Sequence, residues 1–103
     1  MLDYPKRSRD RCPTHPGAML RDIVLPALDI GKSDVADALC ISRQTLYDIL
    51  AEKQPITPQM AVRLSAAFGT TAVSWLNMQT LYDVWHAERV IDTADIRQLK
   101  AVV

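Results

Sequence analysis

The chain has 103 residues, with 12 Lys and Arg against 12 Asp and Glu and an apolar fraction of 49%, enough for one domain with its own core. No apolar run approaches the ~20 residues that cross a bilayer and no signal peptide is evident, so we expect a soluble, cytoplasmic protein with no membrane partner. Cys12 and Cys40 do not form a disulfide framework, and Cys12 with His15 supplies only half of a structural zinc site, so no metal or cofactor is expected.

Residues 1–15 are basic and interrupted by two prolines, and we expect a flexible arm. Its cations could contact phosphate or only keep the segment soluble. Pro16 suits the first turn of a helix, which we expect over residues 16–25 before Pro26 interrupts or kinks it. The apolar face of this helix is expected to hold Met19, Leu20, Ile23 and Val24.

Residues 32–53 predict two short helices joined by a tight turn, the helix-turn-helix motif that places a helix in the major groove of DNA. Ser33 is expected to cap the first helix and Ser42 the second, which should cover residues 43–52. The buried face of the second helix is expected to consist of Leu46, Ile49 and Leu50.

The outward side chains of that second helix carry the functional prediction, because its first turn reaches base edges in this motif. Arg43 can bond a guanine edge bidentately and Gln44 an adenine edge. Thr45 can contact phosphate or a thymine methyl group, and Tyr47 can bond phosphate through its hydroxyl. The alternative is an ordinary solvated helix face. The zero net charge weakens phosphate binding, a difficulty that two copies on a two-fold operator would ease.

Thr57 and Pro58 begin a further helix that Gly69 ends, with Met60, Ala61, Leu64, Ala67 and Phe68 facing inward. A last helix is expected from residue 72 or 73 to about residue 88, and its apolar positions wrap more than one face. Leu76 and Leu81 are expected mainly in the core. The aromatic surplus predicts a homodimer along this helix, with an interface of Met78, Leu81, Tyr82 and Trp85.

The expected fold is therefore all-α: a five-helix helix-turn-helix domain over residues 16–88, a basic arm over 1–15 and a short tail over 89–103. The tail could be a short helix capped by Thr93 or a strand, and it could add to the dimer contact. A two-fold dimer along the last helix would separate the two recognition helices by one DNA turn, ~34 Å.

Two stretches carry a family resemblance: HPGAMLRDIVLPAL before the motif, and SRQTLYDILAEKQPITPQMAVRLSAAFGTTAVSWLNMQTLYDVW from the motif into the last helix. Over residues 16–88 the chain resembles the HigA-type (VapI-like) antitoxins of the Xre/Cro–cI, lambda-repressor-like superfamily. The resemblance implies an antitoxin of a type II toxin–antitoxin system, which neutralises a HigB/RelE-like mRNA-cleaving toxin and represses its own operon as a dimer on operator DNA. The implied DNA-binding residues are Ser33, Ser42, Arg43, Gln44, Thr45, Tyr47 and Lys53.

The chain departs from the family pattern at two places. Cys40 stands where the family usually has glycine, at a turn position that commonly adopts positive φ at a cost of ~1 kcal/mol for other residues. Residues 51–54 read Ala-Glu-Lys-Gln where the family often has Asn-Gly-Lys-Arg, which should lower phosphate affinity.

The alternatives to an antitoxin are a stand-alone regulator without a toxin and an interaction module that has lost DNA binding. An enzyme is not expected, because no acid/base pair or nucleophile–base spacing stands out, and no catalytic residue is assigned.

Overall fold

The computed structural model describes residues 11–99 and is built from helices, with no strand in that range. The elements are α1 (Pro16–Met19), η1 (Leu20–Val24), α2 (Lys32–Leu39), α3 (Arg43–Leu50), α4 (Pro58–Phe68) and α5 (Ala72–Val90). Because α1 runs directly into η1, residues 11–99 form the five helices that the sequence predicts, with α2 and α3 as the helix-turn-helix. The predictions for residues 1–10, most of the basic arm, and for residues 100–103 lie outside the described residues.

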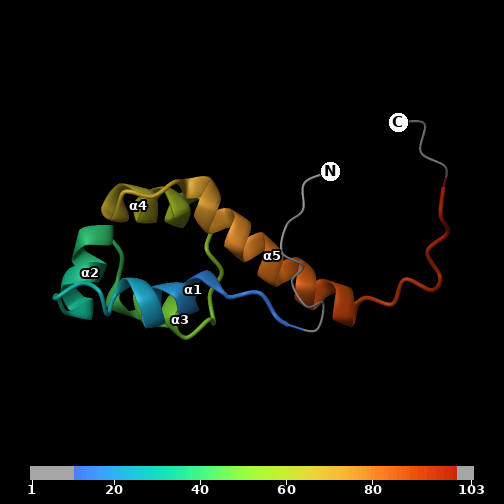
Figure 1. Cartoon of the computed structure of the whole chain (residues 1–103), viewed down its shortest axis with the longest axis horizontal. Coiled ribbons are helices and arrows are strands. Elements are labelled where there is room, and N and C mark those ends of the chain that lie inside the picture. The colour runs from blue at the N-terminus through green and yellow to red at the C-terminus, as the bar shows by residue number, and fades with distance from the viewer. Residues whose placement is uncertain (1–10, 100–103) are drawn as a thin grey trace.

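The core lies where α1, η1, α2, α3 and α4 meet the first part of α5, while the rest of α5 projects away from this body toward the tail (Figure 1). The helices contribute Leu20, Val35, Leu39, Leu46, Ile49, Leu64 and Trp75 as buried core residues. Trp75 is 3% exposed, and its indole N–H donates to the hydroxyl of Thr70 at 2.7 Å. Its burial fixes the start of α5 to the core.

The first helix differs from the prediction in its last turn. The amide of Leu25 donates to the carbonyl of Leu20 at 2.9 Å, an i to i+5 bond that makes η1 a π-helical turn. The wider turn rotates its side chains away from the spacing of an α-helix. As a result, Ile23 is 60% exposed and does not join the core as predicted. Ala67 is likewise exposed on α4, where the prediction placed it inward.

The two helices of the motif begin differently. Ser42 caps α3 as predicted, since its hydroxyl oxygen accepts the amide of Thr45 at 3.0 Å. The predicted cap of α2 by Ser33 is wrong, because Gly31 is the N-cap and its carbonyl accepts the amide of Val35 at 3.1 Å. An N-cap residue has an extended backbone, whereas Ser33 already lies inside the helix, which starts at Lys32. Within residues 11–99, no side chain accepts a hydrogen bond from the first amides of α2.

Two arginines from other helices bond carbonyls at the C-terminal ends of α2 and α3. The guanidinium of Arg63 on α4 donates to the carbonyl of Leu39 at 3.0 Å, at the end of α2. Arg21 on η1 donates in the same way to the carbonyl of Leu50 at 3.0 Å, at the end of α3. Positive charge at a helix C-terminus also complements the helix dipole. These contacts fix α2 and α3 to the surrounding helices at the ends where their carbonyls lack partners.

The motif contains two left-handed residues that are not glycine: Cys40 in the turn, at φ 57° and ψ 43°, and Glu52 after α3, at φ 61°. Both stand where the family pattern has glycine. The chain therefore carries at Cys40 the strain that the sequence suggested. The exposed side chain of Cys40 offers no buried contact to offset that strain.

We expect Cys40→Gly to raise the free energy of unfolding by about 1 kcal/mol, because glycine adopts this conformation without a Cβ clash. Urea denaturation measures the change. Cys40→Ala keeps the Cβ and should leave stability nearly unchanged. An equal gain in both variants would show that loss of the thiol, and not relief of the backbone, is responsible.

The segment before α1 packs against α5. The Nδ1 atom of buried His15 accepts the amide of Gly17 at 2.9 Å and caps α1, and its ring meets the edge of Tyr82 with centroids 4.7 Å apart. Cys12 does not pair with His15; its sulfur lies 3.6 Å from Nε2 of His86. Within residues 11–99, no group of three or more His, Cys, Asp and Glu side chains could hold a metal.

Burial lowers the pKa of His15 below its usual value of about 6.5, and the nearby acidic groups Glu52 and Asp83 oppose the shift. As the pH falls below about 6.5, the unfolded chain takes up the proton first. The free energy of unfolding should therefore fall until the lowered pKa is reached, where the loss levels off. His15→Asn keeps a capping oxygen but does not titrate. Urea denaturation at about pH 7.5 and 5.5 should therefore show a smaller difference in the free energy of unfolding for this variant than for the wild type. An equal difference would assign the acid sensitivity to other groups.

The described part of the tail is neither of the predicted alternatives. After α5 ends at Val90, residues 91–99 contain no helix or strand. A single turn remains, in which the amide of Ala94 donates to the carboxylate of Asp92 at 2.9 Å and the amide of Ile96 to the carbonyl of Thr93 at 3.0 Å. The apolar side chains of this segment, including Ile96 at 66% exposure, have no core to pack against, which explains why no regular element forms.

Candidate nucleic-acid interface

The first turn of α3 is held rigidly at its start. The Ser42 hydroxyl accepts the amide of Thr45 and donates to the Thr45 hydroxyl oxygen at 2.8 Å. Ser42 is therefore engaged as a cap, and Thr45 is half-buried beside it. This arrangement fixes the helix start that presents the next two side chains.

Those two side chains, Arg43 and Gln44, are both exposed. Among residues 11–99, Arg43 takes part in no ion pair, so its guanidinium is available to an external acceptor. Gln44 is restrained: its Nε2 donates to Oδ1 of Asp48, one turn further along α3, at 2.9 Å. The pair therefore combines a cation that has no ion pair in residues 11–99 with an amide that is held in place.

The remaining predicted DNA-binding residues surround this turn. Tyr47 is 46% exposed, and the ammonium of Lys32 lies 5.8 Å from the centre of its ring, which brings the start of α2 close to the outer face of α3. Ser33 follows Lys32 on the uncapped first turn of α2, and Lys53 follows α3; both are exposed. The predicted residues thus come from the first turn of α2, from α3 with its cap and from the segment after α3, and all but half-buried Thr45 are exposed; we refer to this set as the strip.

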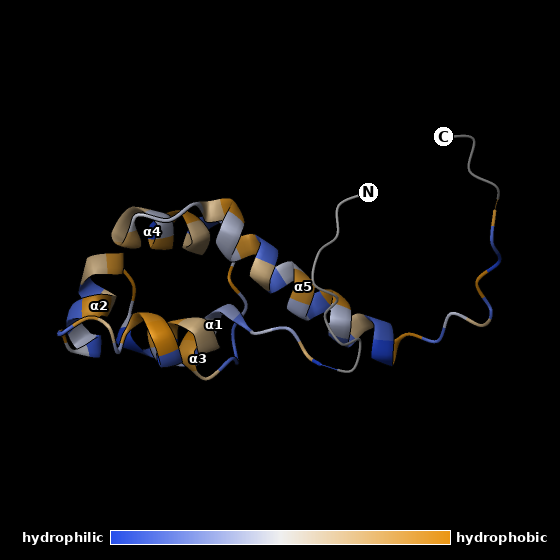
Figure 2. Ribbon diagram, viewed as in Figure 1, coloured by the Kyte–Doolittle hydropathy of each residue, from blue (hydrophilic) through white to orange (hydrophobic). Residues whose placement is uncertain are grey.

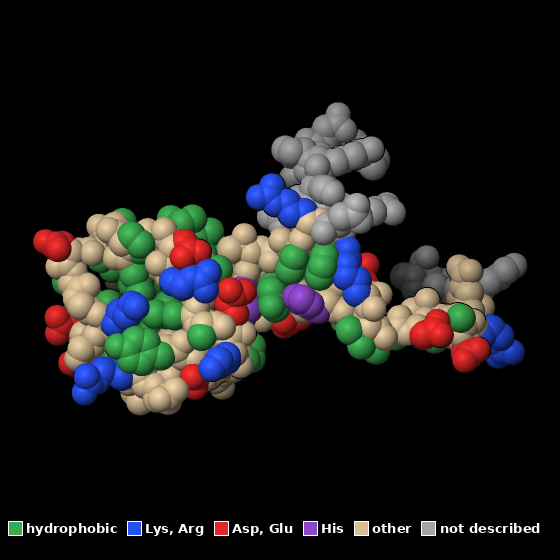
Figure 3. Space-filling view, turned by 90° about the horizontal axis from the view of Figure 1, so that it is seen from below, with side chains coloured by type: hydrophobic (Ala, Val, Ile, Leu, Met, Phe, Trp, Pro, Cys, Tyr) green, Lys and Arg blue, Asp and Glu red, His purple; other side chains and the backbone are tan. Residues whose placement is uncertain are grey.

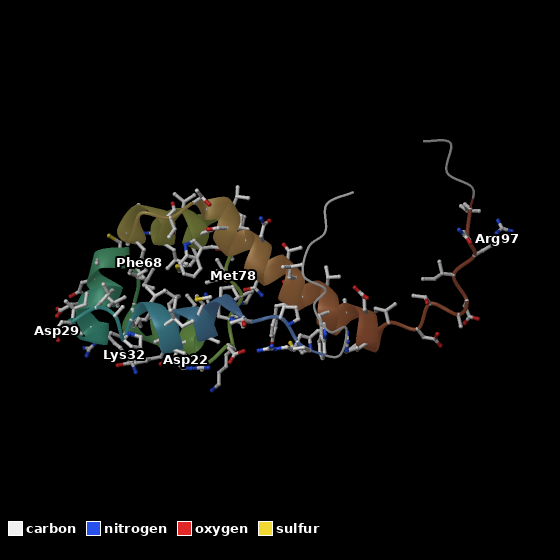
Figure 4. The ribbon with its side chains drawn as sticks, viewed as in Figure 1. Asp22, Asp29, Lys32, Phe68, Met78 and Arg97 are labelled. Carbon is white, nitrogen blue, oxygen red and sulfur yellow. The ribbon has the colours of Figure 1, made fainter. Side chains whose placement is uncertain are left out.

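The charge around this strip is mixed. Basic and acidic side chains are interspersed over the face seen in Figure 3. Lys32 and Asp29 lie at the outer edge of the domain in Figure 4. Glu52, which we expected to weaken phosphate binding, forms an ion pair with Arg21 at 3.2 Å, so its charge is partly balanced within the chain. Arg21 also bonds the carboxylate of Asp22 at 2.9 Å, and this hydrogen bond lowers the pKa of Asp22.

The predicted dimer residues on α5 have unequal environments. Leu81 is 49% exposed, so its assignment to the core is wrong. Met78 points inward (Figure 4) and packs against the core, as does Leu76. Tyr82 is flanked by His15 and by His86, at 4.7 and 4.4 Å between ring centres. The chain's own N-terminal segment thus covers part of the aromatic surplus.

The distal part of α5 carries further aromatic and apolar groups. Trp85 meets the ring of His86 at 5.0 Å, and the guanidinium of Arg89 lies 3.4 Å from the centre of the Trp85 ring. Hydrophilic and hydrophobic residues alternate along this helix (Figure 2). Leu81 and Val84 are both about half exposed on it. In the described part of the chain, no helix is long and apolar enough to cross a bilayer.

Residues 21–76 match the protein family described as Helix-turn-helix. Virulence-associated protein I of Dichelobacter nodosus is 36% identical over 85% of this chain and 82% of its own length. The structure of the antitoxin GraA is similar with a TM-score of 0.80 and 32% identity, over 86% of this chain and 99% of that one. The structure of Pseudomonas aeruginosa antitoxin HigA with the higBA promoter is similar with a TM-score of 0.76 and 34% identity, over 88% and 99% of the two chains.

Proposed function

The chain belongs to the helix-turn-helix family that includes the HigA antitoxins, and we propose that it is the antitoxin of a type II toxin–antitoxin system. In this role it binds the operator of its own operon and represses transcription. It also binds and neutralises a HigB-type toxin. The role requires no catalysis by this chain and places it in the cytoplasm with the DNA.

The observation that carries the DNA-binding half is the first turn of α3, where a capped helix start presents Arg43 and Gln44 to solvent. The similar HigA structure contains promoter DNA, which supports DNA binding by this chain. Arg43 and Gln44 read base edges, with Thr45 and Tyr47 beside them. The phosphate contacts come from Ser33 and Lys53, at the ends of the strip, while Ser42 acts through the helix start that it caps.

We propose that two copies bind together, through the distal part of α5. Leu81 and Val84 supply the exposed apolar contact there, with Tyr82 and Trp85 beside them, whereas Met78 contributes from the edge of the core. We propose that the tail over residues 89–103 adds to this contact. A dimer doubles the number of phosphate contacts, which offsets the mixed charge of the strip. It also matches a two-fold operator with half-sites one DNA turn apart.

A gel shift with the upstream DNA of its own gene tests the operator half of the proposal. We expect a specific complex that survives excess scrambled competitor DNA and weakens steeply as salt rises, because phosphate contacts release counterions. A folded, dimeric protein that binds both DNAs equally would exclude a specific repressor and leave the interaction-module alternative.

The toxin half predicts a small reading frame that encodes a basic protein just upstream, and co-expression of the two proteins tests it. We expect a stable complex of the two proteins and restored growth of cells that express the toxin. Specific operator binding without a protein partner at this locus would instead favour a stand-alone regulator.

A further inference from the structure

The amide of Gln44 has a neighbour that can determine which base it reads. Its Nε2 donates to Oδ1 of Asp48 at 2.9 Å, between residues four apart on the exposed face of α3, a spacing that brings side chains together on a helix. Within residues 11–99, Asp48 forms no ion pair. Gln44 is thus the side-chain partner of an otherwise uncompensated carboxylate.

This contact orients the amide. A carboxylate can only accept hydrogen bonds, so it bonds the amide nitrogen and repels the amide oxygen. A hydrogen bond to an ionised acceptor is also stronger than one between neutral groups. The amide of Gln44 therefore has one favoured orientation, which leaves its oxygen and one remaining N–H for a base edge.

The carboxylate also changes what the base edge must offer. Guanine presents only acceptors, N7 and O6, in the major groove, whereas adenine presents N7 and an amino group. A free glutamine could turn its amide to suit either base. With Asp48 in place, the amide oxygen seeks an amino donor, and the adjacent negative charge disfavours the O6 acceptor of guanine.

We infer that Asp48 is a specificity-determining residue, which restricts Gln44 to adenine and rejects guanine at the same operator position. The inference rests on the proposed operator binding. Asp48 then has two opposite effects. Its negative charge near phosphate lowers the affinity for all DNA, and the same charge raises the discrimination between adenine and guanine. Selectivity is gained here by disfavouring the wrong partner.

The test compares Asp48→Asn with Asp37→Asn, which removes the same charge from an exposed position on α2. Gln44→Ala first locates the operator position that Gln44 reads, and that base pair is then changed to place guanine there. Binding of each protein to both operators is measured by fluorescence anisotropy at fixed salt. Thermal unfolding of each variant verifies the fold.

For Asp48→Asn we expect the ratio of affinities for the two operators to fall about tenfold, within the range of one bidentate base contact. An asparagine has the same size but can donate as well as accept, so it permits both amide orientations. Affinity for scrambled DNA should rise by a similar factor in both variants, and Asp37→Asn should keep the wild-type ratio.

Equal ratios for wild type and Asp48→Asn would overturn the inference and leave the proposed function standing. A wild-type protein without any sequence preference would overturn both, so the two failures are distinguishable. A reduced ratio in Asp37→Asn as well would attribute the effect to overall charge and also overturn the inference.

Discussion

Replacing Gly17 with alanine is expected to destabilise the domain by about 3 kcal/mol, at the upper end of what overpacking costs. A Cβ at this position would lie 1.8 Å from the carbonyl oxygen of Ile49 and 3.0 Å from Nδ1 of His15. The first obstacle is backbone, which cannot rotate away as a side chain can. Helix α1 would have to move off α3, and the buried contacts of Leu20 and Ile49 would be lost with it. Urea denaturation followed by circular dichroism measures the loss.

Gly31→Ser is the matched control, because a Cβ there meets nothing within 4 Å. The backbone of Gly31 is extended at φ −74°, and serine is a better N-cap than glycine by only a few tenths of a kcal/mol. We therefore expect a change close to zero or a slight gain in stability. A Gly17→Ala variant as stable as Gly31→Ser would contradict the close approach of α1 to α3.

The helix-turn-helix could be predicted because its determinants are local. The caps at Ser42 and Thr57, the stop at Gly69 and the buried face of α3 follow from neighbours within a few residues. Cys40 belongs to the same class, since the turn position commonly has a left-handed residue in the family and has one here. The error at Ser33 is also local: caps at Gly31 and at Ser33, two positions apart, were both compatible with the sequence, and the carbonyl of Gly31 accepts the first helical bond.

The contacts between elements could not be predicted, because they depend on how distant segments meet. Nothing in the sequence near Gly17 indicates that its missing side chain makes room for α3. The bonds of Arg21 and Arg63 to the ends of α3 and α2 join residues more than twenty positions apart. The packing of His15 on Tyr82 is similar, and it explains why part of the aromatic surplus on α5 needed no second chain.

In the candidate site, the sequence identified the residue types and the structure added their constraints. Arg43 and Gln44 were assigned to base edges from their position on the first turn of α3. Their different states, one without an ion pair in residues 11–99 and one bonded to Asp48, depend on side-chain conformations that a helical pattern does not specify. Glu52 is the clearest case, because its pairing with Arg21 reduces an expected penalty on phosphate binding.

Arg43→Ala and Gln44→Ala are each expected to weaken operator binding by about 1–3 kcal/mol, roughly 5- to 150-fold, because each removes a bidentate base contact. Each should also relax the base preference at one operator position. Both side chains are exposed, so thermal unfolding should be nearly unchanged. Fluorescence anisotropy with operators substituted one base pair at a time measures affinity and preference together.

Lys53→Ala is the comparison that separates base reading from charge. It removes one positive charge, as Arg43→Ala does, but from the exposed segment after α3, where we propose a phosphate contact. Its binding should weaken by one factor on all operators, and the slope of log affinity against log salt should fall by about 1. The same uniform loss in Arg43→Ala would mean that Arg43 also contacts phosphate. The reading of sequence would then depend on Gln44 and the residues that orient it.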